Sequence, residues 1–367
     1  MNPTLIIDIV YVLVVILVCL KIIYDTESAA RTQAYLLMAI FIPVAGMVFY
    51  FFFGVNYRKR RKYNKKLQAD EERLQRLNRH MLQDSARNLR VHAREVGDGA
   101  GLVQMLLNET YSPLTFGNSL KLLRNGEEKF PEVIRAIEAA EHHIHLEYYI
   151  YEDDTIGNTI KNLLIRKAQE GVEVRLIYDD FGSHSIRRRV VKELTRAGAE
   201  AFPFHHIRLW FLANRLNYRN HRKIIIIDGK CGFVGGINIS DRYLNPSTDP
   251  AGTYWRDTHI RIDGPGIMYL QHVFLCDWSY CSGQPIHPES GYFNQAEIHS
   301  ENTGVQIAAS GPDSPVATIQ LSFLKAISLA RHEILITTPY FIPGETIMDA
   351  LRVAALGGIK VMLLVPD

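Results

Sequence analysis

The sequence has few of the residues that mark disulfide-bonded or nucleic-acid-binding proteins. Its 367 residues include only four cysteines, and no two of them form a C-x-x-C pair. This scarcity favours free thiols in a reducing compartment over a disulfide framework. The formal net charge is only +2, which lacks the strong positive excess of a nucleic-acid-binding domain. We therefore expect no nucleic-acid partner.

One group of residues has the side chains of a zinc site. It consists of His272, Cys276, Cys281 and His287. The spacing of these four is irregular compared with the paired ligands of structural zinc sites. We expect an ordinary buried helix and loop here, and neither a metal nor a cofactor.

Charges are almost missing from two stretches near the N-terminus. Residues 5–23 are interrupted only by Asp8 and Lys21, and residues 34–55 contain no charge. Each stretch is long enough to cross a hydrocarbon core of about 30 Å. We predict a two-helix transmembrane hairpin over residues 1–57, with a kink at Pro43. A cleaved signal peptide is the alternative for the first stretch, but no basic region precedes it.

A basic run directly after the second stretch predicts the orientation of this hairpin. Seven of the nine residues from 58 to 66 are Lys or Arg, whereas the connector 24–33 has one such residue. The positive-inside rule then puts everything after the hairpin in the cytoplasm. We interpret residues 58–101 as a basic juxtamembrane helix and linker that contacts anionic lipids. A short dimerising coil is the alternative.

The remaining chain alternates helix-like and strand-like segments, which indicates an α/β fold. Residues 144–150 and 172–180 have strand patterns, and the helix pattern between them ends at Gly171. The same order returns later, where the final "GGIKVMLLVPD" matches "EGVEVRLIYDD" of residues 170–180. We predict two related α/β halves in tandem, over residues 102–300 and 301–367.

The second of these halves is predicted to be truncated. His221 lies 50 residues after Gly171, and the glycine that matches Gly171 is Gly358. A partner histidine would therefore fall roughly near position 408, beyond Asp367. We expect the chain to be a fragment or a truncated form of a longer protein.

The most informative stretch is "NHRKIIIIDGKCGFVGGINIS", residues 220–240. On a strand, His221 and Lys223 project to the same face. The four isoleucines that follow bury both faces, as in a central strand. The pair Asp228-Gly229 is a hairpin-turn signal. The return strand 230–234 would bring residues 235–238 beside the histidine and the lysine.

Four kinds of group would then meet at the open end of this hairpin. They are an imidazole, an ammonium group, the amide of Asn238 and the bare backbone of Gly235 and Gly236, where a ligand can approach closely. Such a set suits an oxyanion with spread charge, such as a phosphoryl group. A histidine placed there can attack phosphorus.

This pattern, H-x-K-x4-D-G followed by G-G-x-N, resembles the phospholipase D superfamily. Five further segments are similar to its bacterial cardiolipin synthase branch: residues 114–137, 144–157, 171–183, 254–265 and 337–343. The resemblance runs through nearly the whole chain and includes the two apolar N-terminal stretches. It implies phospholipase D-like α/β halves and a site without metal or cofactor.

The resemblance also implies roles for single residues. His221 would be the nucleophile that forms a phosphohistidine, or the acid for the leaving alcohol. Lys223 and Asn238, with the backbone at Gly235 and Gly236, would bind the phosphate.

Three more residues belong to the implied site. Ser240 would add a hydroxyl to the phosphate site, and Asp257 would orient the histidine through a hydrogen bond. Asp228 is counted with the catalytic motif, although its place at the turn favours a structural role.

The implied reaction transfers a phosphatidyl group from one phosphatidylglycerol to another and gives cardiolipin and glycerol. Phosphatidylglycerol and anionic membrane lipids would be the partners of a multi-pass protein in a bacterial inner membrane, with its catalytic domain in the cytoplasm. Four arginines near the motif would attract anionic headgroups or form a solvated basic face. They are Arg208, Arg215, Arg219 and Arg222.

Two other functions compete with this one. A hydrolase of the same superfamily would use water in place of the lipid alcohol and cleave phospholipid or nucleic acid. A membrane scaffold would have no catalysis at all. Family members carry two histidine motifs, and this chain has one, so we expect it to be inactive alone or to pair as a homodimer.

Overall fold

The structure is a computed structural model of the whole chain, and it describes residues 3–25, 29–51, 83–204, 219–245, 254–285, 291–293, 297–311, 314 and 316–366. These residues belong to two compact units. The N-terminal unit contributes the described residues before position 52, and the larger unit contributes the rest. The predicted basic run 58–66 lies outside the described residues.

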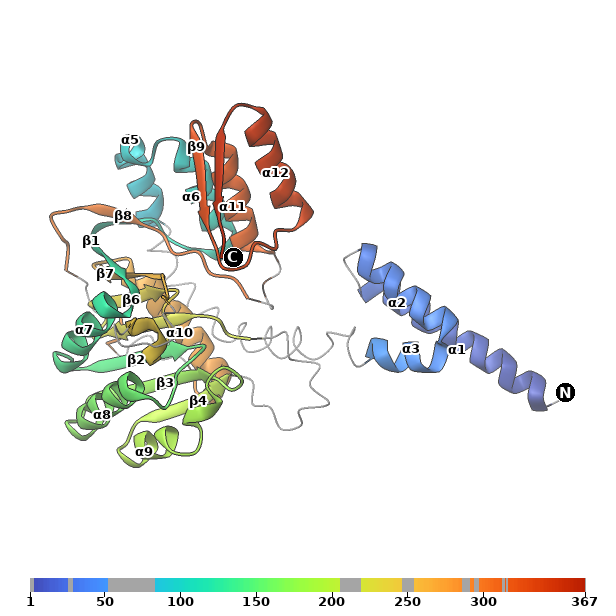
Figure 1. Cartoon of the computed structure of the whole chain (residues 1–367), viewed down its shortest axis with the longest axis horizontal. Coiled ribbons are helices and arrows are strands. Elements are labelled where there is room, and N and C mark those ends of the chain that lie inside the picture. Colours follow the sequence, from blue (N-terminus) through green and yellow to red (C-terminus); the bar gives the residue numbers. More distant parts are fainter. Residues whose placement is uncertain are drawn as a thin grey trace. The chain divides into compact units, whose positions relative to one another are not determined.

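The described residues of the N-terminal unit form three helices, α1 (Pro3–Asp25), α2 (Ala29–Phe41) and α3 (Pro43–Phe49) (Figure 1). The predicted second span is not one continuous helix, because the chain leaves helical geometry at Ile42, where φ is −131°. Pro43 has no N–H to continue the helix. A Cβ at Gly46 would lie 2.1 Å from the Met38 carbonyl oxygen, so a glycine is needed for the close approach. The predicted kink is therefore present as a full break.

The three helices bury only a small part of their apolar surface against one another. Val18, Ile22, Ala39 and Tyr50 form a small buried cluster, whereas Leu17 is 63% exposed. In the described part of the chain, no helix is both long enough and apolar enough to span a membrane. The predicted transmembrane hairpin is therefore not confirmed.

The larger unit is built on an eight-stranded sheet with the order β4-β3-β2-β5-β6-β7-β1-β8 (Figure 1). Its strands β2, β3 and β4 are parallel, and the other neighbours are antiparallel. The sheet is therefore mixed, as in an α/β fold with an antiparallel part. Its strands are β1 (Thr115–Arg124), β2 (His143–Tyr148), β3 (Glu173–Asp179), β4 (Glu200–Phe204), β5 (Lys223–Ile227), β6 (Cys231–Gly235), β7 (Thr258–Asp263) and β8 (Thr303–Val305).

Helices cover both faces of this sheet (Figure 1). α7 (Asn125–Glu138), α8 (Thr155–Gln169) and α9 (Val190–Arg196) share one apolar core with the sheet, and α10 (Ile267–Ser282) shares a second. Alternate residues of β5 serve the two cores. Ile225 packs on the α7 side and Ile224 on the α10 side, so the four isoleucines form a central strand as predicted. The shorter helical elements are residues 83–91, α5 (Ala93–Val96), η2 (Gly97–Gly99), α6 (Ala100–Thr110), η3 (His184–Ile186) and η5 (Asp241–Leu244).

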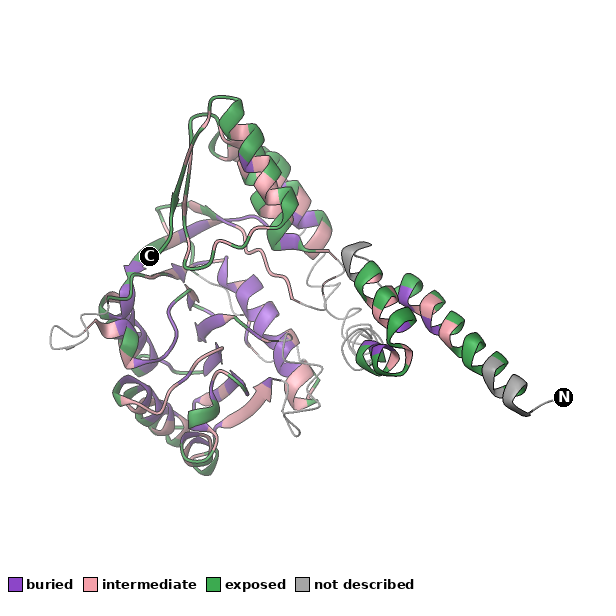
Figure 2. Ribbon diagram, turned by 45° about the vertical axis from the view of Figure 1, so that its right-hand side comes forward, coloured by how far each residue is buried: buried purple, intermediate pink, exposed green. Residues whose placement is uncertain are grey.

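The internal repeat predicted from the sequence is present in the fold. β2 and β3 are parallel and joined by α8, and the later strands β9 (Glu333–Thr337) and β10 (Lys360–Leu364) are parallel and joined by α12 (Glu345–Leu356). A further helix, α11 (Thr318–Leu329), precedes β9 as α7 precedes β2. Burial differs between the two copies (Figure 2). All residues of β2 are buried, whereas Leu335 of β9 is 60% exposed.

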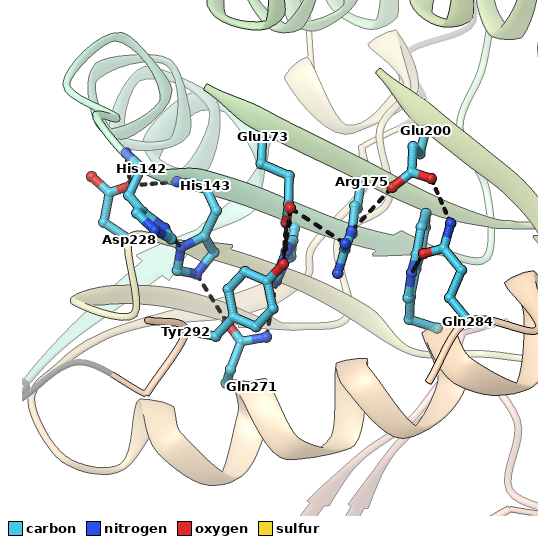
Figure 3. A network of polar contacts seen from close by, with 11 residues as sticks. His142, His143, Glu173, Arg175, Glu200, Asp228, Gln271, Gln284 and Tyr292 are labelled. Carbon is cyan, nitrogen blue, oxygen red and sulfur yellow. Dashed lines mark hydrogen bonds and ion pairs between the residues drawn. The ribbon is translucent and has the colours of Figure 1, made fainter. Parts of the chain in front are cut away.

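The face of β2 toward α10 is polar although it is buried. Its inward side chains are His143, His145 and Glu147, each with no exposed surface. Gln271 of α10 bridges the two imidazoles: its Oε1 lies 3.1 Å from His143 Nε2 and its Nε2 lies 2.9 Å from His145 Nδ1 (Figure 3). Because an amide nitrogen only donates, His145 carries its proton on Nε2. That nitrogen lies 3.2 Å from the Glu173 carboxylate and donates to it.

Burial keeps these imidazoles neutral. It lowers the pKa of His143 to about 3, with the neighbouring His145 adding to the effect, and it also lowers the pKa of His145. Burial would raise the pKa of Glu173, but hydrogen bonds from His145 and Tyr292 lower it to about 2. The network then continues through Arg175 and Glu200 to Gln284 (Figure 3). It fixes α10 to the sheet by directed polar contacts.

We predict that Gln271→Leu destabilises the larger unit. The substitution leaves the His143 Nε2 donor and the His145 Nδ1 acceptor buried without partners, at a cost of about 2–6 kcal/mol for the two groups together. Thermal unfolding of the purified protein measures the loss. Gln284→Leu is the matched control, because water can replace the contacts of this partly exposed side chain. Equal losses in the two variants would contradict the importance of the bridge.

Candidate active site

The predicted hairpin is present as β5 and β6. Residues 224–227 pair with residues 234–231 in antiparallel register. At the turn, Asp228 and Gly229 have φ values of +55° and +64°. Two successive positive values are what a two-residue type I′ turn requires, so the local sequence determines this connection.

Asp228 lies at the end of β5 that is remote from His221. Its carboxylate accepts hydrogen bonds from the backbone N–H groups of Glu141, His142 and His143 at 2.8–2.9 Å. These bonds join the turn to the start of β2. The contacts of Asp228 are those of a structural anchor.

His221 and Lys223 lie together at the open end of the hairpin. The Lys223 ammonium group donates to the His221 carbonyl oxygen (2.7 Å) and lies 3.2 Å from His221 Nδ1. The imidazole is exposed, and its ring centroid lies 4.6 Å from that of Tyr149. Lys223 is nearly buried and lies 5.5 Å from the same ring. Tyr149 thus holds both groups of the motif.

Both groups bind protons more weakly than they would in water. Burial lowers the pKa of Lys223 to about 8, and the negative charge of Asp257 acts against this. Desolvation and the positive charge of Lys223 lower the pKa of His221. At neutral pH the imidazole is therefore unprotonated and able to attack phosphorus, while the ammonium group still carries charge.

Asn238 lies against the same segment that carries Tyr149. Its side-chain oxygen accepts a hydrogen bond from the Ile150 N–H (3.2 Å), and its amide nitrogen donates to the Tyr243 hydroxyl (2.7 Å). Its carbonyl oxygen lies 3.3 Å from the buried Lys129 ammonium group, which also donates to the carbonyl oxygen of the preceding residue. Among the described residues, the second N–H of the Asn238 amide has no partner and could bind a ligand.

The two glycines of the motif make room for side chains of β7 and the segment before it. A Cβ at Gly236 would lie 2.1 Å from a carboxylate oxygen of Asp257, and one at Gly235 would lie 2.6 Å from His259 Nδ1. Glycine at these positions therefore admits the acid and the histidine against the hairpin.

Both backbone groups of Asp257, its N–H and its carbonyl oxygen, are hydrogen-bonded to Asn125. Asn125 at the start of α7 donates from its N–H to the Asp257 carbonyl oxygen (2.9 Å) and accepts from the Asp257 N–H (3.0 Å). The carboxylate accepts from the Thr258 N–H at 2.6 Å. Among the described residues, no hydrogen bond joins Asp257 to His221, so its orienting role stays a prediction.

Ser240 is buried in a separate polar contact. Its hydroxyl donates to Glu152 (2.8 Å) and accepts from the Arg242 N–H (3.4 Å). The structure thus brings His221, Lys223 and Asn238 to one segment, residues 149–150. The predicted phosphate contact of Ser240 stays a prediction.

The basic residues near the motif pair with buried acids. Arg222 contacts Asp277 of α10, and Arg219 lies 3.7 Å from Asp179. The attraction of anionic headgroups stays a prediction, whereas a solvated basic face is wrong for these two residues. It failed because their partners lie far away in the sequence. Arg208 and Arg215 lie outside the described residues.

Some polar residues of this region carried no signal in the sequence. Lys129 and His259 are fully buried beside the motif, and no hydrogen-bond partner for either ring nitrogen of His259 occurs among the described residues. Isolated Lys and His in a helix and a strand do not differ from surface residues in a single sequence. Both residues lie in segments that resemble the cardiolipin synthase branch, 114–137 and 254–265, but the resemblance gives neither of them a role.

The four residues with zinc-type side chains are only partly described by the structure. His272 and Cys276 are one turn apart on α10, with 3.7 Å between His272 Nε2 and the sulfur, and His287 lies outside the described residues. In the part of the chain that the structure describes, no three His, Cys, Asp or Glu side chains are grouped to hold a metal ion.

Comparisons with known proteins show which family the chain resembles. A family model described as "Cardiolipin synthase, PLD-like domain" matches residues 133–252. The chain is 39% identical over 364 residues to the cardiolipin synthase of Alkalihalophilus pseudofirmus, a match that covers 98% of this chain and 70% of that protein. It is 37% identical over 374 residues to the major cardiolipin synthase ClsA of Bacillus subtilis, covering 99% and 75%.

Solved structures are more distant. Phosphatidylserine synthase from Haemophilus influenzae is 15% identical with a TM-score of 0.47, covering 71% of this chain and 65% of that chain. The two cardiolipin synthases are much closer in sequence, and the matches with this chain cover more than two thirds of their length. On that basis, this chain belongs to the cardiolipin synthase family and contains its phospholipase D-like domain.

Proposed function

We propose that the protein makes cardiolipin from two molecules of phosphatidylglycerol, with His221 as the nucleophile. The observation that carries this proposal is the contact of His221 and Lys223 with each other and with Tyr149. An unprotonated imidazole beside a buried cation suits attack on a phosphodiester. The relatives named cardiolipin synthase support the choice of substrate.

The reaction has two transfers at one phosphorus atom. A nitrogen of His221 attacks the phosphorus of the first phosphatidylglycerol, the bond from phosphorus to the headgroup glycerol breaks, and the glycerol oxygen takes a proton. The terminal hydroxyl of the second phosphatidylglycerol then attacks the phosphohistidine. Its proton is released, the phosphorus–nitrogen bond breaks, and cardiolipin leaves.

The other motif residues stabilise this chemistry. The Lys223 ammonium group and the remaining N–H of Asn238 would hold the phosphate oxygens, where negative charge grows in the transition state. Asp257 would stabilise the charge on the neighbouring cation and on the imidazole. Asp228 serves the turn, and Ser240 holds the loop that follows Asn238 through Glu152.

We also propose that the N-terminal helices attach the protein to a bacterial inner membrane as a hairpin. Their apolar side chains are exposed to a degree unusual for a water-soluble unit; examples are Leu13, Leu17 and Leu20 at 53%, 63% and 58%. The basic run 58–66 would place the catalytic unit on the cytoplasmic side. We include in this proposal the domain boundaries predicted from the sequence, namely residues 1–57, 58–101, 102–300 and 301–367. Pairing of the chain with a second copy is also part of it.

We predict that His221→Ala abolishes cardiolipin formation. Without the imidazole no covalent intermediate forms, so the rate falls to background. The test is the lipid profile of cardiolipin-deficient bacteria that express the chain or its variant, with His184→Ala, an exposed histidine on η3, as the control.

Three results would contradict this prediction. Cardiolipin in the His221→Ala cells at the level of the unmodified chain would assign the nucleophile to another residue. Phosphatidic acid without cardiolipin would support a hydrolase. No lipid change with either protein would remove the proposed activity from this chain and support a scaffold.

We predict a bell-shaped pH profile of kcat/KM. The pKa of His221 lies below its usual value, so the neutral nucleophile is lost only as the pH falls below about 6.5. The pKa of Lys223 is about 8, so the cation is lost as the pH rises through that value. In Lys223→Arg the residual activity should lose the alkaline limb, because arginine stays charged. An unchanged alkaline limb in that variant would assign it to another group.

We predict that the N-terminal helices resist extraction from membranes. The chain should stay with the membrane pellet after an alkaline carbonate wash, because its exposed apolar side chains lie in lipid. The double substitution Leu13→Lys and Leu17→Lys should release it. A chain that washes off without substitution would contradict the proposed attachment.

A further inference from the structure

The two neighbours of His221 are tied to buried acids. The Asn220 N–H donates to Asp179 (3.2 Å), and its side-chain amide contacts Glu147. The Arg222 guanidinium pairs with Asp277 of α10 and lies 3.8 Å from Glu147. The exposed histidine therefore sits between two residues whose side chains are fixed inside the protein.

These contacts come from the face of the sheet opposite to the one that carries the motif lysine. Lys223 pairs with Tyr148 across the strands, and Ile225 beyond it packs in the α7 core. Arg222 and Ile224 instead face α10. The strand thus presents its reactive groups on one side and its anchors on the other.

The anchors are buried and connected to each other. Glu147 has no exposed surface and Asp277 has 2%. Burial raises the pKa of Glu147 to about 7, against the opposing charge of Arg222 and the hydrogen bond from Asn220. The Arg222 N–H also donates to the Asn220 side chain (2.9 Å). A closed set of contacts therefore fixes the backbone on both sides of the histidine.

This arrangement points to a function for two acids outside the motif. We propose that Glu147 and Asp277 are positioning residues: through Asn220 and Arg222 they hold His221 against Tyr149 and Lys223. The inference rests on the proposed function for its effect on catalysis. The geometry itself does not depend on which phosphodiester is cleaved.

The first test is kinetic. Asp277→Asn and Glu147→Gln keep the shape of the side chains and remove the charge that holds Arg222. We expect kcat for cardiolipin formation to fall about 10- to 100-fold, because a shift of about 1 Å at a reacting atom has that effect. The KM for phosphatidylglycerol should stay nearly unchanged, because Lys223 and Asn238 remain.

The matched control removes an ion pair of the same kind elsewhere. Glu193 of α9 pairs with the buried Lys161 of α8, and Glu193→Gln should leave kcat unchanged. A fall in kcat equal to that of Asp277→Asn would show a general loss of stability and overturn the proposal. So would a rise in KM with kcat unchanged in the two site variants.

The second test does not need turnover, so it separates this inference from the proposed function. Carbethoxylation of His221 in the purified chain at pH 7.5 is followed by peptide mass spectrometry. The rate should rise severalfold in Asp277→Asn and Glu147→Gln, because the ring is released from Tyr149 and Lys223, and stay unchanged in Glu193→Gln. The buried His143 and His145 should stay unmodified in every folded variant. Equal His221 rates in all proteins would overturn the proposal, even if cardiolipin is formed.

Discussion

The hairpin of β5 and β6 is fixed at both ends by buried carboxylates, and the arrangement of the motif depends on this constraint. At the turn, Asp228 binds three backbone N–H groups at the start of β2. At the open end, Glu147 and Asp277 bind the neighbours of His221. The four isoleucines between these ends contribute buried apolar surface, but apolar contacts alone do not fix the position of the strand along its own axis. Directed bonds to charged groups are what set the register of the reactive end.

The two faces of the central strands differ in chemistry, one being apolar and the other polar. Toward α7 and α8 the sheet is apolar and close-packed. Toward α10 it carries two neutral histidines, an acid and an arginine, which are joined in one network of hydrogen bonds and ion pairs (Figure 3). A buried polar network tolerates fewer arrangements than an apolar core, since any unpaired member is costly. Because this network fixes α10 on the sheet, Asp277 of α10 can hold Arg222 beside the motif, although the two residues are far apart in the sequence.

Local chemistry explains which features could be predicted. The Asp228-Gly229 turn, the buried isoleucine strand and the β-α-β repeat depend on residues close in sequence, and each is present. The α7 helix begins at Asn125, and Asn125 is held by Asp257, which lies 132 residues away in the sequence. Arg222 looked like a basic surface residue for the same reason, since Asp277 lies 55 residues away. The antiparallel strands β1, β7 and β8 also depend on distant pairing and had no local signal strong enough to find them.

The central claim is that His221 carries the phosphatidyl group between two lipids. Mass spectrometry of the chain, quenched during turnover with phosphatidylglycerol, tests it directly. The account predicts one phosphatidyl adduct, acid-labile and on His221, that is absent from His221→Asn. Cardiolipin formation with no adduct on His221, or with the adduct on another residue, would contradict it.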